Sequence, residues 1–302
     1  VSPDGDTLGS ALALKLRLTA MGKSVRLLVD GEVPSNLAFL SRMGAVEGPE
    51  AEAGAADLAL AVDVSCKERL GACAPAFLAA ARTAVVDHHS SNPGFAQINW
   101  VDGDAPATAV LVYRLLEAMG GALSREEAVC LYTGLSTDTG NFIYESTSAE
   151  SFRMMAALME AGLPLAEYAR RLFRVKELPF VRLLGETLPS LHLICGGKVA
   201  GITLTAAQMR QAGAKAGHTD GLVDYAIDLE GVAMAYFARE TEDGRVKVSL
   251  RALEPWRVDQ VAERFGGGGH RLASGLTLDM PLAEVVRVVE GALTEVLGSV
   301  NA

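Results

Sequence analysis

The sequence lacks the features of a membrane protein and of a disulfide-stabilised secreted protein. Acids or glycines interrupt its apolar runs well before the roughly 20 residues that a membrane span requires. No basic segment with a small-residue cleavage site opens the chain. The cysteines, Cys66, Cys73, Cys130 and Cys195, include no Cys-x-x-Cys pair, so we expect reduced thiols and a cytoplasmic location.

Positive charge is also scarce. The chain carries 27 Lys and Arg residues against 37 Asp and Glu residues, which gives a net charge of −10. Proteins that hold long duplex nucleic acid by its phosphates are usually basic, so we expect neither that partner nor a membrane. A short polyanion held by local cations or metal ions is compatible with this charge balance.

The length and the hydrophobic content predict two domains, each with its own core. The chain has 302 residues, of which 50% are hydrophobic. In the first part, helices and apolar strands alternate every ~25–30 residues, which predicts an α/β domain with a doubly wound, mostly parallel sheet. The expected strands are residues 24–30, 57–63 and 83–86, and the expected helices are residues 11–21, 36–43, 74–81, 106–119 and 125–135.

A helical connector precedes a second region with a different pattern. Residues 148–190 are mostly helical in character and contain no flexible Ser/Gly linker. Short strands then mix with helices, which predicts a smaller α+β C-terminal domain. The expected boundaries are residues 1–186 for the first domain with its connector and 187–302 for the second.

Acids and histidines stand at the ends of predicted strands and helices in the first domain. They are Asp4 and Asp6 before the first helix, Asp63 after a buried strand, Asp87-His88-His89 after the next strand, and Asp138 in a loop after a helix. Taken singly, each has a structural alternative, namely a helix cap, a turn or a solvated polar loop.

Taken together, these residues predict a metal centre. Because the carboxyl ends of parallel strands share one edge of a sheet, we expect the acids and His88 to converge there. Converging carboxylates repel one another and need a strong positive counterpart. Two divalent ions with one bridging carboxylate would provide it, and oxygen-rich ligands with imidazole favour Mn²⁺.

A glycine-rich segment in the second domain is a separate candidate site. Residues 266–269 are consecutive glycines, and glycine lets backbone N–H groups turn toward an anion. A tight, flexible turn is the alternative, and for Arg251, at a strand end, the alternative is a surface cation. The predicted substrate-binding residues are Arg251, Gly267, Gly268, Gly269, His270, Arg271 and Ser274.

The ordered motifs resemble those of the DHH phosphoesterases over essentially the whole chain. The matching stretches are residues 3–10 (PDGDTLGS), Asp63 with Arg69, Asp87-His88-His89, residues 137–142 (TDTGNF), and residues 265–270 (FGGGGH) with 273–275 (ASG), the last resembling the DHH-associated C-terminal domain. The first motif of that family begins with a His three residues before the Pro-Asp pair, so we expect this ligand to lie ahead of Val1.

The resemblance implies a role for each site residue. Asp63 would bridge two Mn²⁺ ions, His89 would contact the substrate phosphate, and Asp87 would orient the site. A metal-bridging hydroxide would attack phosphorus in line. The implied metal ligands are Asp4, Asp6, Asp63, His88 and Asp138.

The compact two-domain form resembles the nanoRNase/pAp-phosphatase branch of the RecJ-like proteins. This implies hydrolysis of short oligoribonucleotides (nanoRNA), of 3′-phosphoadenosine 5′-phosphate (pAp), or of both. Open alternatives are a cyclic-di-AMP or pApA phosphodiesterase, a two-Mn pyrophosphatase and a non-catalytic nucleotide-binding regulator. A homodimer is likewise left open.

Overall fold

The computed structural model describes residues 3–49 and 56–300. The chain divides into two compact units, residues 1–175 and 176–302. The predicted domain boundary after residue 186 falls inside helix α7 (Leu178–Thr187) of the second unit. Each unit is considered by itself.

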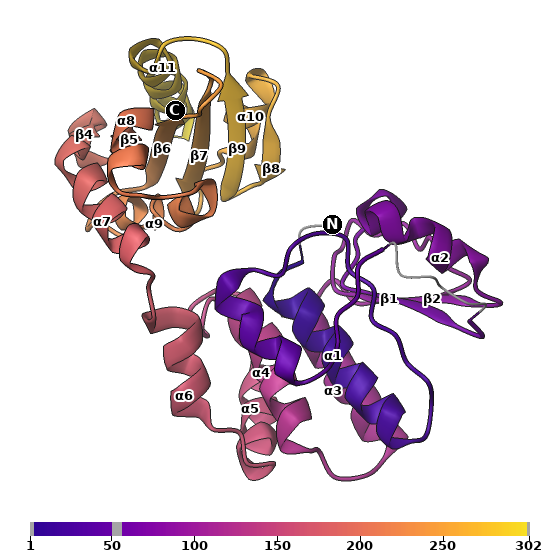
Figure 1. The fold of residues 1–302 in the computed structure, drawn as a ribbon. Helices are drawn as coiled ribbons and strands as arrows, with labels where there is room; N and C mark the ends of the chain where they lie inside the picture. The colour runs from indigo at the N-terminus through magenta and orange to yellow at the C-terminus, as the bar shows by residue number, and fades with distance from the viewer. Residues whose placement is uncertain (1–2, 50–55, 301–302) are drawn as a thin grey trace. The chain divides into compact units, whose positions relative to one another are not determined.

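The first unit contains a short parallel sheet and a larger set of helices (Figure 1). The sheet has three strands in the order β1-β2-β3, and both pairings are parallel. Its elements are α1 (Gly5–Ala20), β1 (Ala59–Val62), α2 (Ala74–Ala79), β2 (Thr83–Asp87), β3 (Ile98–Val101), α3 (Thr108–Met119), α4 (Arg125–Asp138), α5 (Ala149–Glu160) and α6 (Leu165–Ala169), with a 3₁₀ helix at Ser35–Arg42.

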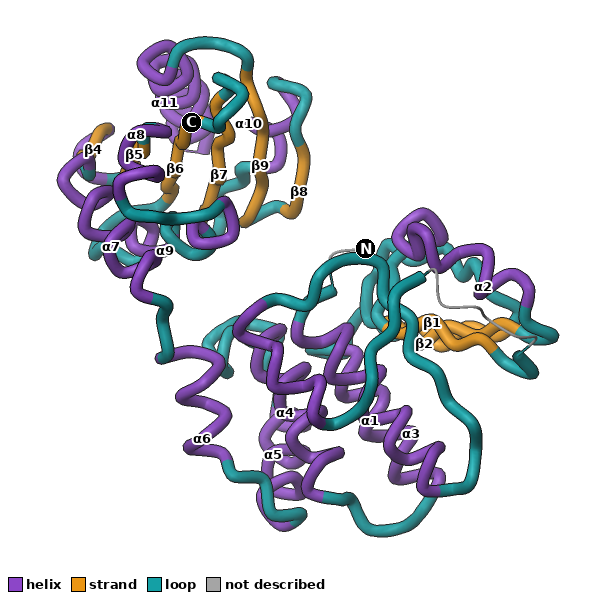
Figure 2. The backbone as a smooth tube through the Cα atoms, viewed as in Figure 1, coloured by secondary structure: helices purple, strands orange, loops and turns teal. Residues whose placement is uncertain are grey.

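Alternating side chains of β1 and β2 enter different cores. Val62 and Val86 pack in the core that also contains residues of α1, α3 and α4. Their neighbours Ala61 and Val85 pack with Phe77 of α2 on the opposite face. Figure 2 shows α2 on one side of these strands and α1 and α3 on the other. The prediction of an α/β domain with helices on both faces of a parallel sheet is confirmed.

Two details of the strand prediction were wrong. Residues 24–30 are not a strand, because among the described residues this segment pairs only through an isolated bridge between Leu28 and Glu47. The prediction also missed β3, in which Asn99 interrupts the apolar pattern of a buried strand. The parallel sheet is therefore built from β1, β2 and β3 alone among the described residues.

The second unit is a mixed sheet with helices on both faces. Its six strands have the order β4-β5-β6-β7-β9-β8, and only β5 and β6 are parallel neighbours. On β6, Tyr236 faces a core with α10 and α11, whereas Phe237 faces a core with α7 and α9. Its further elements are β4 (His192–Ile194), β5 (Val199–Leu204), α8 (Ala206–Gln211), α9 (Asp224–Ile227), β6 (Met234–Glu240), β7 (Val246–Ala252), α10 (Asp259–Arg264), β8 (Gly268–His270), β9 (Ala273–Leu278) and α11 (Leu282–Val300).

Within residues 3–49 and 56–300, no helix has both the length and the apolar character needed to cross a bilayer.

Candidate metal centre

Two adjacent parallel strands deliver Asp63 and His88 to one edge of the sheet. Val62, the last residue of β1, pairs with Val86, so the residues that follow the two strands lie side by side. The Asp63 N–H donates to the Val86 carbonyl at 2.9 Å. Asp63 has a φ of 60°, a left-handed conformation that Asp tolerates better than most residues.

Helix ends supply the other acids. Asp6 lies in the first turn of α1, whose N-cap is Asp4. Asp138 is the last residue of α4, which corrects the expectation that it stands in a loop. The left-handed backbone that stops the helix begins two residues later, at Gly140 (φ 56°) and Asn141 (φ 59°).

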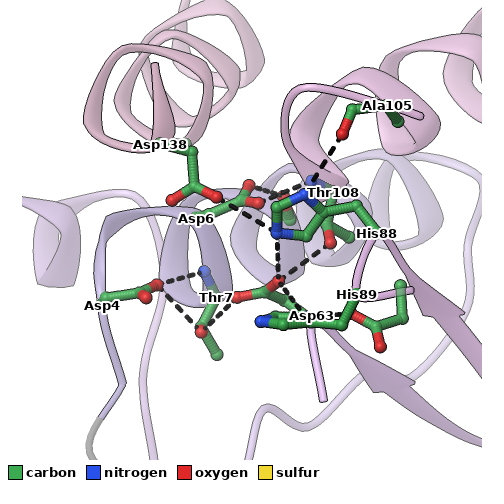
Figure 3. A network of polar contacts seen from close by, with 12 residues as sticks. Asp4, Asp6, Thr7, Asp63, His88, His89, Ala105, Thr108 and Asp138 are labelled. Carbon is green, nitrogen blue, oxygen red and sulfur yellow. Dashed lines mark hydrogen bonds and ion pairs between the residues drawn. The ribbon is translucent and has the colours of Figure 1, made fainter. Parts of the chain in front are cut away.

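The acids and histidines meet in one compact cluster (Figure 3). Ligand atoms of Asp6, His88 and Asp138 all lie within 4.8 Å of one another, and so do those of Asp63, His88 and His89. The distance from His88 Nε2 is 3.1 Å to Asp138 Oδ2 and 3.6 Å to Asp63 Oδ1. The structure thus brings these side chains together, while their role as metal ligands stays a prediction.

Asp6 is fully buried and held by the N-terminus of α3. Its carboxylate accepts hydrogen bonds from the backbone N–H of Thr108 at 2.6 Å and of Ala109 at 2.9 Å, and from the Ser10 hydroxyl at 2.9 Å. A helix N-terminus carries partial positive charge, which stabilises a carboxylate. Even so, burial and the neighbouring Asp63 raise the pKa of Asp6 well above its usual value.

Asp63 is held by two threonine hydroxyls. Thr7 lies 2.7 Å from Oδ2 and Thr108 lies 2.9 Å from Oδ1. Burial, followed by the charge of Asp4, raises the pKa of Asp63 to about 6. Neither threonine was predicted as part of the site, although Thr7 belongs to the quoted PDGDTLGS stretch and Thr108 lies near the start of the expected helix 106–119.

Asp4 is exposed and caps α1. Its Oδ1 accepts from the Thr7 N–H at 2.9 Å and lies 3.0 Å from the Thr7 hydroxyl. The capping alternative therefore describes what Asp4 does in this structure. Because Thr7 also reaches Asp63, Asp4 lies beside the cluster (Figure 3). Whether Asp4 also binds metal stays a prediction.

The ring of His88 is oriented by a backbone carbonyl. His88 Nδ1 lies 3.2 Å from the Ala105 carbonyl oxygen, which can only accept, so Nδ1 carries the proton. This arrangement directs Nε2 at the carboxylates and is the usual one for a metal-ligating histidine. Burial alone would lower the pKa of His88, but Asp138, Asp6 and Asp63 outweigh it and raise the pKa to about 9.

The ring of His89 is oriented by Asp87, which is itself held by Asn92. His89 Nδ1 lies 2.7 Å from Oδ1 of the fully buried Asp87. Asn92 donates to Asp87 Oδ2 at 2.6 Å and to the Val64 carbonyl at 2.9 Å. Burial favours a raised pKa for Asp87, but the hydrogen bonds from His89 and Asn92 outweigh it and lower the pKa. Asn92 was also missed; its only sequence signal is its position shortly after the histidine pair.

Glycines allow α1 and α4 to approach closely enough to build the cluster. A methyl group on Gly9 would lie 2.3 Å from the Cys130 carbonyl oxygen of α4. A methyl group on Gly134 would lie 2.6 Å from Asp6 Oδ1. The Cys130 oxygen belongs to the helix backbone and Asp6 Oδ1 is held by hydrogen bonds, so a side chain at either position would separate the helices or displace Asp6.

The donor set fits divalent cations. It consists of carboxylate oxygens and imidazole nitrogens, and among the described residues neither group of ligands contains a cysteine. Oxygen ligands with one or two imidazoles suit Mn²⁺ better than a thiolate site would. The raised pKa values of Asp6 and Asp63 show that burial and mutual repulsion disfavour their ionised forms, and bound cations would relieve both effects.

In the second unit, the predicted glycine-rich site is an edge strand. Gly268–His270 forms β8, which pairs antiparallel with β9. A methyl group on Gly267 would lie 2.2 Å from the Gly275 carbonyl oxygen, and one on Gly269 would lie 2.6 Å from Cα of Ser274. These two glycines are thus required by the close approach to β9. A methyl group on Gly268 would meet no atom of the described residues within 4 Å, so its backbone face is open.

Three of the four side chains predicted to bind substrate there, those of Arg251, Arg271 and Ser274, have partners within the second unit. Arg251 Nε donates to Asp224 at 3.2 Å, and Arg271 donates to Glu254 at 2.7 Å. The Ser274 hydroxyl is buried and donates to the His270 carbonyl at 2.7 Å. Their substrate-binding role stays a prediction.

Comparison with known proteins gives matches in both units. A model described as the DHH family, N-terminal domain, matches residues 1–135, and a model described as the DHHA1 domain matches residues 198–297. The bifunctional oligoribonuclease and PAP phosphatase NrnA of Thermus thermophilus is 33% identical, covering 97% of this chain and 88% of that protein. Its Bacillus subtilis counterpart of the same name is 26% identical, covering 92% and 87%.

A solved structure is similar as well. An exopolyphosphatase-related protein from Bacteroides fragilis has a TM-score of 0.87 and 27% sequence identity, covering 97% of this chain and 89% of its own. The similarity therefore extends through the fold of both units.

Proposed function

Because the chain belongs to the DHH family of phosphoesterases, we propose that its substrates are short oligoribonucleotides, 3′-phosphoadenosine 5′-phosphate, or both. The observation that carries the proposal is the convergence of Asp6, Asp63, His88 and Asp138 at one edge of the parallel sheet. The names of the Thermus and Bacillus relatives support this substrate class.

Asp6, Asp63, His88 and Asp138 would hold two divalent cations, with Mn²⁺ favoured and Asp4 as a further ligand. When bound, these cations would neutralise the carboxylates and act as Lewis acids on the scissile phosphate. The protein contributes fixed geometry, because each of Asp6 and Asp63 is already held by hydrogen bonds from Thr108. A ligand held in advance loses little freedom when the cation binds.

His89 would donate to a phosphate oxygen of the substrate. Its Nδ1 is engaged by Asp87, which leaves Nε2 as the nitrogen available to substrate. The negative charge of Asp87 stabilises the protonated ring and raises the pKa of His89. A positioned donor of this kind stabilises the charge that develops on the phosphate oxygens during displacement.

A hydrolysis panel tests the proposal. Metal-free protein is loaded with Mn²⁺, Mg²⁺ or Zn²⁺ and given pAp, a 5-mer RNA, pApA, cyclic-di-AMP and pyrophosphate. We expect fastest turnover of the RNA, of pAp or of both with Mn²⁺. Asp138→Asn should lose most activity, whereas Asp104→Asn, a change at an exposed acid of the same unit, should not.

Other outcomes separate the alternatives. Turnover confined to cyclic-di-AMP or pApA would replace the proposed substrate with a cyclic or linear dinucleotide. Cleavage of pyrophosphate alone would indicate a pyrophosphatase. Nucleotide binding without hydrolysis of any substrate under any metal would refute the enzyme and favour a nucleotide-binding regulator.

A further inference from the structure

The loop that follows Asp138 presents apolar side chains to solvent. Ile143 is 80% exposed and Tyr144 is 57% exposed. Among the described residues of the first unit, the exposed aromatic side chains are those of Tyr144 and of Phe152, which lies 58% exposed on α5. Both belong to the segment that begins directly after Asp138, so the exposed aromatic surface of this unit is confined to it.

The backbone of the loop is strained, and local contacts hold it in place. Asn141 and Phe142 are consecutive residues in the left-handed region, with φ of 59° and 70°. Such strain persists only where surrounding contacts impose it, and it occurs preferentially at functional sites. Here the Phe142 ring stacks on Phe152 with centroids 5.5 Å apart, and the Thr139 carbonyl accepts from the N–H groups of Ile143 and Tyr144 at 3.0 and 3.1 Å.

One face of the Tyr144 ring rests on the backbone of Gly140. A methyl group on Gly140 would lie 2.5–2.7 Å from ring carbons of Tyr144, so only glycine permits this contact. Gly140 follows Asp138 by two residues, so their Cα atoms are at most about 7.6 Å apart. The ring therefore lies over the residue two positions after Asp138, while Tyr144 as a whole remains 57% exposed.

We propose that Tyr144 is a stacking platform for a nucleobase of the substrate whose phosphate lies at the cluster of Asp6, Asp63, His88 and Asp138. The inference rests on the proposed phosphoesterase function and deepens it by assigning a base subsite. Aromatic rings stack on any nucleobase, typically contributing about 1–3 kcal/mol per base. A base is the occupant that fits, since it is a flat aromatic group tethered to the phosphate through the sugar.

The test compares substrates that share phosphates but differ in the base. The catalytic efficiency, kcat/KM, is measured for pAp and for ribose 3,5-bisphosphate, which lacks the base. Tyr144→Ala should lower kcat/KM for pAp by about 5- to 150-fold, the change that corresponds to the stacking energy, and leave the base-free substrate unchanged. Tyr144→Phe should retain wild-type values on both.

Calorimetry gives a second readout that does not depend on turnover. Wild-type protein should bind AMP more tightly than ribose 5-phosphate, and Tyr144→Ala should remove the difference. Tyr144→Leu keeps apolar bulk over Gly140 without an aromatic ring, so it serves if the alanine variant unfolds. Met21→Ala is the matched control, because Met21 is 52% exposed at the C-terminal end of α1, about 26 Å along the helix from Asp4.

The outcomes separate this inference from the proposed function. If wild-type protein hydrolyses no nucleotide, the proposed function fails. If wild-type protein is active and Tyr144→Ala loses equal activity on the base-containing and base-free substrates, Tyr144 only supports the Asp138 loop and the platform is refuted. An active alanine variant with unchanged pAp kinetics would refute it as well.

Discussion

Asp63→Asn should stabilise the protein in the absence of metal and abolish its stabilisation by metal. Burial and the charge of Asp4 raise the pKa of Asp63 from 3.8 to about 6. Between these two pH values the folded protein binds more protons at this site than the unfolded chain does, so stability falls as pH rises. Above pH 6 the folded protein carries the full free-energy cost of ionising the buried Asp63 carboxyl group. A pKa difference of about 2 corresponds to a cost of about 3 kcal/mol.

Asparagine fits the position without new strain. Like Asp, it tolerates the left-handed backbone at residue 63, where φ is 60°. The Thr7 hydroxyl has one proton but lies near two carboxylate oxygens, 2.7 Å from Asp63 and 3.0 Å from Asp4. With Asn at position 63, the amide can donate to Thr7, which then donates to Asp4. An alanine would lose both the hydrogen bonds and the conformational tolerance.

Thermal unfolding of metal-free protein, followed by circular dichroism from pH 4 to pH 8, measures the effect. At pH 7 the first unit of Asp63→Asn should gain up to about 3 kcal/mol, or roughly 6–12 °C in Tm. The gain should shrink as pH falls from 6 toward 4. Saturating Mn²⁺ should raise the Tm of wild-type protein but not of the variant. Asp104→Asn should change neither.

Two results would refute this reasoning. A metal-free variant less stable than wild type at pH 7 would show that Asp63 is not a source of electrostatic strain. A gain that is the same at pH 4 and pH 7 would show that the effect comes from packing rather than from ionisation.

The remaining predictions concern packing and a buried ion pair. Gly134→Ala should lower the free energy of unfolding, measured in urea, by about 1–3 kcal/mol, because the added methyl group displaces Asp6. It should also weaken Mn²⁺ binding in a titration, and unchanged metal affinity would contradict this prediction. The control is Gly291→Ala in the middle of α11, where the added methyl group would meet no atom of the described residues within 4 Å. This change should raise the free energy of unfolding by up to about 1 kcal/mol and leave metal binding unaffected. Arg17→Ala should cost about 3–5 kcal/mol, since it leaves the buried carboxylate of Glu127 without the partner that now lies 2.8 Å away; a loss below about 1 kcal/mol would contradict it.

The placement of the cluster could be predicted because it follows from topology. Asp63 and His88 each come directly after an apolar strand, and adjacent parallel strands end at the same edge. No knowledge of side-chain packing is needed for that step. Asp138 was predicted close to its true place, but the helix that carries it extends further than its apolar pattern, which fades before Ser136 and Thr137.

The residues that hold Asp63 and Asp87 in place could not be predicted in the same way. Thr108 and Asn92 are ordinary polar residues in loops or at a helix start, where capping and turn roles are common. The contact between Thr108 and Asp63 joins residues that are 45 positions apart in the sequence. The contact between Asn92 and Asp87 forms only because the chain turns back after the histidine pair. Similarly, the sequence pattern did not reveal that Gly267 and Gly269 are required by contact with β9, while the predicted ligand-binding role of the glycine run stays a prediction.

The donors that hold the acids are compatible with the proposed role of the cluster as a cation site. Asp6 accepts from two backbone N–H groups and a serine, and Asp63 accepts from threonine hydroxyls. These neutral donors fix the carboxylates in place without cancelling their charge. A cationic side chain in the same positions would satisfy the acids, but it would also compete with a divalent ion for the same oxygens. The protein therefore accepts electrostatic strain in the metal-free state, and the pKa of about 6 at Asp63 measures part of it. That strain is also a reason for a bound divalent cation to stabilise the fold, because binding removes the repulsion that hydrogen bonds alone leave in place.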